Sequence, residues 1–335
     1  MNWYAELADW CGSEGVQSYT VLEGPHAGWK AAIGTGELRC VPDQKSWWQQ
    51  RLADFAHPLP GVYRWGEDEV FGERLYRAPQ VVILGGGHIS KALCTLLDLL
   101  RWPVTVVEDR AEFARQERFP QARVQQMEFS EYFAQPQQPG NWYYVIATRG
   151  HAHDALCLEA ILRRPFGYVG MLGSRKKIAR TRALMEEKGI ATEVFDRVHT
   201  PIGLDIGGQT PEEIAVSIAA EMIQEKNRVG LECYLDEQVA EALHQSGPAV
   251  LVRIVAKEGS APRGVGARML IRPHDTVGTI GGGKVEFTVV EEARRLLEQK
   301  GGCVCRSYAL NNEEAGALGM WCGGRLRVAL EPMEE

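Results

Sequence analysis

The chain has 335 residues, of which 45% are hydrophobic and 24% are charged, and its formal net charge is −7. This length is enough for two or three globular domains, each with a core of its own. The negative net charge argues against nucleic acid as the main partner, because neutralising phosphates requires clustered Lys and Arg. Composition therefore favours a globular protein whose ligands or partners are not nucleic acids.

The same composition indicates a reducing compartment. Eight cysteines are too few for a disulfide scaffold, and Cys303 and Cys305 lack the spacing of common zinc and redox pairs. The first residues contain no cationic stretch followed by an apolar one, and no segment approaches 18 uninterrupted apolar residues. We expect a cytoplasmic protein that is neither exported nor embedded in a membrane.

Residues 1–78 predict a small N-terminal α+β segment. A strand pattern occurs at residues 19–22, and the spacing of apolar side chains predicts a helix within residues 46–55. The simplest interpretation is a cap that packs its tryptophans. The Leu-Glu-Gly-Pro sequence at 22–25 also echoes residues 257–262, so a degenerate copy of the C-terminal segment is the alternative.

The central segment, residues 79–228, alternates strand and helix patterns. The expected strands are residues 81–84, 104–107, 143–147 and 167–171. Such alternation predicts an α/β fold with a doubly wound parallel sheet of the Rossmann type. A closing helix is expected after Thr210, which can cap it together with Pro211 and Glu213.

A phosphate-binding fingerprint follows the first of these strands. Gly85 and Gly87 occupy the first two glycine positions of Gly-x-Gly-x-x-Gly, and Ser90 replaces the third. Asp109 or Glu108 supplies the acid that such a site uses for ribose hydroxyls. We expect a nucleotide here, while a Rossmann-like domain with a vestigial site is the alternative.

Polar residues also follow the third strand of this segment. Arg149, His151, His153 and Asp154 lie at the carboxyl edge of the sheet, where open α/β sheets bind ligands. They could hold a substrate or a metal. Alternatively, Asp154 caps a helix beside exposed histidines.

The fourth strand leads into Gly173, Ser174 and Arg175, followed by two lysines at a helix start. Cations at a helix N-terminus oppose the macrodipole unless an anion is present. The pattern therefore favours a bound phosphate.

The C-terminal segment, residues 229–335, is rich in glycine. Its glycine clusters lie at residues 259–267, 281–286 and 318–324. Glycine allows positive φ angles and close approach of a ligand to the backbone. Arg263 and Arg268 suit a phosphate, Lys284 follows the second cluster, and Cys322 offers a soft ligand or a sulfur-transfer thiol. An inert buried thiol is the alternative for Cys322.

Together these segments resemble the XdhC/CoxI family, the accessory factors of xanthine dehydrogenase and related molybdenum hydroxylases. The resemblance is carried by the glycine clusters and by residues 81–88, 148–154, 170–175 and 201–215. Family members commonly place the glycine-rich module before the Rossmann domain, whereas here the order is reversed. Lys284 stands where the CoxI-like branch has cysteine, which leaves Cys322 as the motif thiol.

The resemblance implies a chaperone for the molybdenum cofactor, as molybdopterin or its dinucleotide form. Such a factor binds and protects the cofactor, supports its sulfuration by a cysteine desulfurase and delivers it to a molybdenum hydroxylase apo-enzyme. It acts without catalysing the hydroxylation, and a homodimer is compatible with this role. The implied cofactor-binding residues are Gly85, Gly87, His88, Asp109, Arg149, His151, Asp154, Gly173, Ser174, Arg175, Arg263, Arg268, Gly282, Gly283, Lys284 and Cys322, with Cys322 as metal ligand.

Two other functions remain open on the sequence alone. The first is an NAD(P)-dependent oxidoreductase that uses the Gly85–Gly87 loop for the dinucleotide and His151 or His153 as acid or base. The second is an interaction scaffold whose ligand sites are vestigial. Dinucleotide binding with turnover would identify the first, and partner binding without any small-molecule binding would identify the second.

Overall fold

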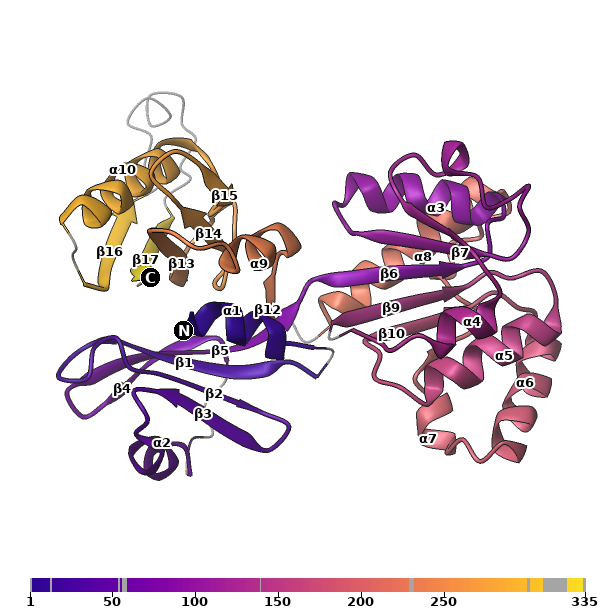
Figure 1. Ribbon diagram of the computed structural model, residues 1–335, viewed down its shortest axis with the longest axis horizontal. Helices are drawn as coiled ribbons and strands as arrows, with labels where there is room; N and C mark the ends of the chain where they lie inside the picture. Colours follow the sequence, from indigo (N-terminus) through magenta and orange to yellow (C-terminus); the bar gives the residue numbers. More distant parts are fainter. Residues whose placement is uncertain are drawn as a thin grey trace. The chain divides into compact units, whose positions relative to one another are not determined.

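The computed structural model describes residues 2–12, 14–53, 55, 59–138, 140–228, 232–299, 302–309 and 324–333, without the side chains of His151, Arg175, Lys176 and Glu232. It contains two compact units (Figure 1). Residues 78–230 form one unit, and residues 1–77 together with 231–335 form the other. The N-terminal and C-terminal segments, which are separate in the sequence, thus share a unit.

The unit of residues 78–230 is a Rossmann-like domain. Its strands are β6 (Pro79–Leu84), β7 (Val104–Glu108), β8 (Arg123–Gln126), β9 (Asn141–Ile146), β10 (Tyr168–Met171) and β11 (Val198–His199). They form one sheet in the order β11-β10-β9-β6-β7-β8, and every neighbouring pair is parallel. The predicted doubly wound parallel sheet is confirmed. Strand order reverses between β6 and β9, which is where open α/β sheets bind ligands.

Helices cover both faces of this sheet (Figure 1). One face carries α3 (His88–Leu99) and α8 (Pro211–Lys226), and the other carries α4 (Phe129–Ala134), α5 (His151–Leu162), α6 (Arg175–Glu187) and α7 (Thr192–Phe195). Val81 and Ile83 belong to the first core and Val82 and Leu84 to the second, because side chains alternate along a strand. A strand covered on both faces must be apolar throughout, as its sequence is.

The predicted start of α8 is confirmed in detail. Thr210 is its N-cap and accepts a hydrogen bond from the backbone N–H of Glu213 at 3.2 Å. The Glu213 carboxylate reaches back to the backbone N–H of Thr210 at 3.1 Å, which completes a capping box, and Pro211 occupies the first turn.

The other unit contains two sheets. Its N-terminal part comprises α1 (Trp3–Trp10), β1 (Val16–Glu23), β2 (Lys30–Gly34), β3 (Glu37–Val41), α2 (Lys45–Leu52), β4 (Gly61–Trp65) and β5 (Asp68–Arg77). Its C-terminal part comprises β12 (Glu232–Leu235), α9 (Glu237–Leu243), β13 (Ala249–Glu258), β14 (Arg268–Ile271), β15 (Thr276–Gly278), α10 (Gly283–Gln299), β16 (Val304–Ala309) and β17 (Arg325–Met333). The C-terminal sheet is antiparallel, in the order β15-β14-β13-β17-β16.

The two sheets of this unit pack against each other. A shared core joins side chains of α1, β1 and β5 to those of α9, β13 and β14. Helices α2 and α10 cover the two outer faces (Figure 1), with Trp48 of α2 fully buried. None of the helices in the described part of the chain is both long and apolar enough to cross a membrane.

Candidate functional site

The loops that follow β6 and β9 meet at the point where strand order reverses. Gly85, directly after β6, has a φ of +110°, and a Cβ there would lie 2.4 Å from the carbonyl oxygen of Ala147, directly after β9. Glycine is required at this position both for its φ and for this close approach. The predicted glycine loop and the segment starting at Thr148 are therefore neighbours, as expected for ligand-binding loops at one sheet edge.

Gly87 differs from Gly85, because the space beside it is open. It is the N-cap of α3, and a Cβ placed there would have no described atom within 4 Å. His88, the first residue of α3, is exposed. The free N–H groups of a helix start attract anions, so this position can receive a phosphate. Ser90, in the place of the third glycine, is buried in α3.

The two candidate acids after β7 have different environments. Glu108 is 1% exposed; its carboxylate accepts hydrogen bonds from the backbone N–H of Gly86 at 2.6 Å and from the guanidinium of Arg110 at 2.8 and 3.0 Å. Burial by itself raises the pKa of Glu108, but the hydrogen bonds from Arg110 and from the Gly86 N–H outweigh it and lower this pKa to about 2. Glu108 is therefore a clamp on the glycine loop.

Asp109 is the acid that remains accessible. Its side chain is 20% exposed, and Nε of Arg110 lies 3.9 Å from its Oδ1. Partial burial and the neighbouring Glu108 raise the pKa of Asp109. Of the two acids, Asp109 is thus the one that can accept hydrogen bonds from ribose hydroxyls.

Two arginines near the glycine loop, Arg110 and Arg118, were not predicted from the sequence. Arg118 donates from Nη2 to the carbonyl oxygen of Gly86 at 2.9 Å, and the guanidinium groups of Arg110 and Arg118 lie 4.0 and 4.9 Å from the ring of Phe113. Arg118 brings positive charge to the glycine loop, whereas the charge of Arg110 is balanced by Glu108. Their only sequence signal is proximity to the acid after β7, since the contacts of Arg118 bridge 32 residues.

Asp154 is engaged inside the protein. It is 1% exposed and accepts a hydrogen bond from Thr148 Oγ1 at 2.7 Å, and its other oxygen forms an ion pair with Lys177. His153 packs its ring against Phe129, with 5.4 Å between ring centroids. Within the described residues no group of three His, Cys, Asp or Glu side chains could hold a metal. Asp154 in α5 therefore joins the loop after β9 to α6, and is not a free ligand.

Arg149 remains exposed on the loop after β9, whereas the side chain of His151 lies outside the described part of the structure. At the next strand end, Lys177 turns back and donates from Nζ to the carbonyl oxygen of Leu172 at 2.9 Å, in addition to its pair with Asp154. One of the three cations predicted to need a phosphate is thus neutralised by the protein itself. Ser174 is the exposed N-cap of α6, directly after Gly173, and the Arg175 side chain is not described.

The C-terminal glycine clusters are partly filled by the protein's own groups. Gly281, Gly282 and Gly283 all have positive φ, and Oε2 of Glu286 accepts hydrogen bonds from the backbone N–H groups of Ile280 at 3.0 Å and Gly282 at 2.9 Å. Burial by itself raises the pKa of Glu286, but these bonds and one from Thr279 lower it. The Glu286 carboxylate thus already occupies the backbone N–H groups that could bind an anion here. Lys284 beside it is exposed.

The two arginines predicted to bind phosphate in this segment also differ. Arg263 is exposed, and its Cγ would lie 3.6 Å from a Cβ on Gly281, so the first two glycine clusters meet at this point. Arg268 is buried in β14, pairs with Glu73 at 2.5 Å and donates to the carbonyl oxygen of Gly266 at 2.7 Å. Its guanidinium serves the interior of the unit and is not presented to a ligand. Cys322 lies outside the described residues.

Comparison with known proteins assigns both parts of the chain. Residues 81–222 match the XdhC Rossmann domain, and residues 242–308 match the XdhC and CoxI family, which together is more than half of the chain. The chain belongs to the XdhC/CoxI family. The resemblance stated from the sequence is thereby confirmed, and the two predicted parts are an XdhC Rossmann domain and an XdhC/CoxI module.

The similar proteins include the Escherichia coli (strain K12) protein YqeB, which is 33% identical over 44% of this chain. Another is a probable xanthine dehydrogenase subunit of Bacillus subtilis (strain 168), which is 29% identical over 48% of this chain. The chain spans 28% and 47% of the lengths of these relatives. A solved structure of a Bacillus halodurans xanthine dehydrogenase has a TM-score of 0.45 at 20% identity and covers 64% of this chain and 61% of its own.

Proposed function

We propose that this protein is an accessory factor for a molybdenum hydroxylase of the xanthine dehydrogenase type, and that its Rossmann domain binds the phosphate-bearing part of the molybdenum cofactor. Membership in the XdhC/CoxI family supports the class of function. The observation that carries the site is the open space beside Gly87 at the start of α3, with Asp109 accessible after the next strand.

The residues fit a nucleotide or pterin phosphate in four ways. The N–H groups at the start of α3 would receive the phosphate, and Gly87 leaves room for it. Asp109 would accept hydrogen bonds from hydroxyl groups. Arg149 is exposed on the neighbouring loop and would add a cation. Ser174, at the next strand end, offers a hydroxyl and a second helix start.

The molybdenum cofactor, when bound, supplies redox chemistry to the client enzyme, whereas the residues of this chain would hold, orient and shield it. In the XdhC/CoxI module, Arg263 and Lys284 are the exposed cations beside the glycine clusters. Cys322 is proposed to hold the metal, because a thiolate binds soft metals. A cysteine desulfurase and the hydroxylase apo-enzyme are the proposed partners, and delivery of the cofactor is the proposed outcome.

The test is Gly87→Val in the full-length protein, with Thr95→Val as matched control. A Cβ at position 87 would have no described protein atom within 4 Å, so the variant should fold and yet block the phosphate. Thr95 lies on the same helix, is exposed and is also β-branched, so the control introduces valine away from the site. We expect calorimetry with AMP, CMP, GMP and NAD(P) to show binding of at least one nucleotide to wild type and control, and a loss of roughly tenfold or more in Gly87→Val.

Retention of cofactor is the second measurement. Protein purified anaerobically from cells that make the molybdenum cofactor should carry pterin, and Gly87→Val should carry less. Stoichiometric NAD(P) binding with substrate turnover would instead identify an oxidoreductase. Wild-type protein that binds a partner but neither nucleotide nor pterin would contradict the proposal and identify a scaffold.

A further inference from the structure

The N-terminal half of the two-sheet unit repeats the architecture of the XdhC/CoxI module. Elements α1-β1-β2-β3-α2-β4-β5 and α9-β13-β14-β15-α10-β16-β17 have the same succession of helices and strands. The strands of the two copies have the same order, β3-β2-β1-β5-β4 and β15-β14-β13-β17-β16, and all of these pairs are antiparallel. The first sheet also contains β12, which belongs to neither succession and pairs with β5 in parallel. Residues 11–15 join the first helix to the first strand in one copy and residues 244–248 do so in the other, five residues in each case.

Strand irregularities allow the two copies to be aligned. The register of β1 against β5 shifts after Val21, and the register of β13 against β17 shifts after Ile254. When these two residues are matched, Thr20 becomes the equivalent of Arg253. These two residues touch, because Nη2 of Arg253 donates to Oγ1 of Thr20 at 3.1 Å. A residue meets its own equivalent only at a two-fold axis, which places a pseudo-two-fold axis here.

A buried ionic network obeys the same axis. Glu73 pairs with Ser18 on β1, and Glu331 pairs with Leu251 on β13. Ser18 lies two residues before Thr20, and Leu251 lies two residues before Arg253. The two glutamates are therefore equivalents. Arg253 lies between them, with Nη1 2.8 Å from Oε1 of Glu73 and Nη2 2.5 Å from Oε1 of Glu331. The arginine of one copy thus neutralises both equivalent carboxylates.

The flanking cations are equivalent as well. Lys30 pairs with Thr20 across β2 and β1, and Arg268 pairs with Arg253 across β14 and β13. Lys30 lies 3.7 Å from Glu331, and Arg268 lies 2.5 Å from Glu73. Each cation therefore pairs with the glutamate of the opposite copy, as a two-fold axis requires.

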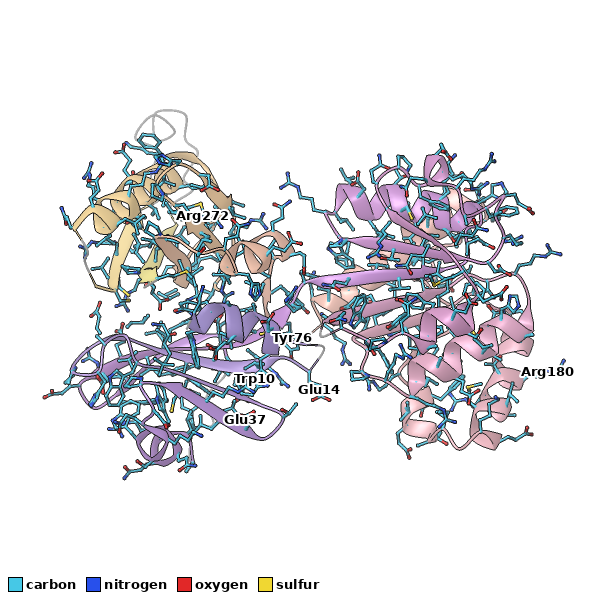
Figure 2. The ribbon with its side chains drawn as sticks, viewed as in Figure 1. Trp10, Glu14, Glu37, Tyr76, Arg180 and Arg272 are labelled. Atoms are coloured by element: carbon cyan, nitrogen blue, oxygen red, sulfur yellow. The ribbon has the colours of Figure 1, made fainter. Side chains whose placement is uncertain are left out.

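Apolar contacts across the axis give independent support. One buried cluster consists of Leu22 with Val255 and Phe71 with Ala329, and the strand registers make each of these pairs equivalent. The first helices are held at equivalent strand ends: Trp10 of α1 packs on Gly34, and Arg272 donates to the carbonyl oxygen of Ala242 in α9 at 2.9 Å. Both Trp10 and Arg272 are labelled in Figure 2.

From these correspondences we infer that residues 3–77 are a degenerate second copy of the XdhC/CoxI module, which occupies the place of a partner module across the pseudo-two-fold axis. The interaction surface is the inner face of β13, β14 and β17, and the partner that it fits is another module of the same fold. The family match at residues 242–308 falls in the C-terminal copy.

The N-terminal copy lacks the triple glycine of the C-terminal copy. Its first connection, residues 24–29, is shorter than residues 259–267, and Pro-Asp-Gln at 42–44 precedes α2 where the triple glycine precedes α10. Nδ1 of His26 lies 2.7 Å from Oδ2 of Asp68, and the His26 ring lies 4.4 Å from that of Trp29 and 5.0 Å from that of Trp47. The triple-glycine turn thus belongs to the C-terminal copy of the pair.

An exchange of equivalent residues tests the axis. In the full-length protein, Arg253→Thr leaves two buried carboxylates without their shared cation, and Thr20→Arg adds a second buried cation, so each should lower the thermal midpoint of this unit. If the positions are equivalent, an arginine at 20 reaches Glu73 and Glu331 from the other side. The double variant Thr20→Arg/Arg253→Thr should therefore recover most of the loss. A double variant no more stable than the worse single variant would overturn the repeat.

A milder exchange keeps the test decisive if the Arg253 variants do not fold. Lys30→Arg/Arg268→Lys exchanges two equivalent cations, and its midpoint should stay close to that of wild type, whereas Arg268→Met should lower it clearly. A loss in the exchange as large as that of Arg268→Met would overturn the inference. Hydrogen exchange of peptides from β5 and β13 assigns each change to this unit. Nucleotide binding at the Rossmann domain is measured in parallel, so failure here is distinguishable from failure of the proposed function.

Discussion

Glu108→Gln tests whether the clamp on the glycine loop depends on a buried charge. The two oxygens of the Glu108 carboxylate accept hydrogen bonds from the Gly86 N–H and from the backbone N–H and the guanidinium of Arg110. A glutamine has one oxygen and one NH₂ group, so one set of these donors would face another donor. The substitution keeps the shape of the side chain while removing its charge and half of its acceptors.

The magnitude follows from the pKa of Glu108. This pKa falls from the ordinary 4.5 to about 2 in the folded protein, which corresponds to about 3 kcal/mol at ~1.4 kcal/mol per pKa unit. Because the folded pKa is the lower one, the stabilisation is fully present above about pH 4.5 and is lost as the pH falls through about 2. We therefore expect Glu108→Gln to destabilise the Rossmann domain by about 3 kcal/mol at pH 7, and by progressively less below pH 4.5.

Urea unfolding at pH 7 and between pH 5 and 3 measures this difference, and hydrogen exchange of peptides from β6, α3 and β7 assigns it to the Rossmann domain. Glu112→Gln is the matched control, because Glu112 is exposed in the same loop and should change the free energy of unfolding by less than about 0.5 kcal/mol. A loss below about 1 kcal/mol, or one that does not shrink on acidification, would refute a clamp that acts through charge.

Three further outcomes are expected. Lys177→Met should lower the free energy of unfolding in urea by about 3–5 kcal/mol, because it leaves Asp154 buried without its cation. Adding Asp154→Asn to the same chain should restore much of this loss. Additive effects of the two substitutions would contradict the ion pair. Glu286→Ala should lower the free energy of unfolding by about 0.5–2 kcal/mol and speed hydrogen exchange at the start of α10, as loss of a helix cap does. Unchanged exchange would show that the glycine turn keeps its conformation without the Glu286 carboxylate. Burial raises the pKa of Cys11 and of Cys94 to about 12. Iodoacetamide at pH 8 should therefore leave both thiols unlabelled in the folded protein, which mass spectrometry of the peptides measures. Rapid labelling of either thiol would contradict its burial.

Much of the Rossmann domain is predictable from local pattern. The expected strands 81–84 and 104–107 lie within β6 and β7, and the cap of α8 forms at Thr210 as predicted. These features depend on residues that are close in sequence. An apolar run bounded by glycine indicates a buried strand, and a capping box forms within four consecutive residues. The doubly wound topology follows because parallel strands need helical crossovers.

The chemistry of the site is less predictable, because adjacent residues in sequence have different partners in space. Glu108 and Asp109 are equally plausible acids by spacing, yet the fold buries the first against Gly86 and Arg110 and leaves the second accessible. In the same way, Arg268 satisfies the composition of a phosphate site but faces Glu73, which lies far away in the chain. Long-range ion pairs of this kind have no local signature.

The sequence by itself determined the α/β Rossmann domain, the family and the glycine loop at Gly85 and Gly87, because each rests on short-range patterns of apolar, glycine and capping residues. Only the tertiary structure decided the role of residues 3–77. Their echo of the C-terminal module is confined to a few residues around Gly24, since the outer face and the loops have changed. The equivalence persists in strand order, in register and in the charges around Arg253, whose contacts with Glu73 and Thr20 join residues 180 and 233 positions apart. A fold and a buried interface can thus be retained where sequence similarity is lost, because packing and charge pairing constrain positions in space and not their order in the chain.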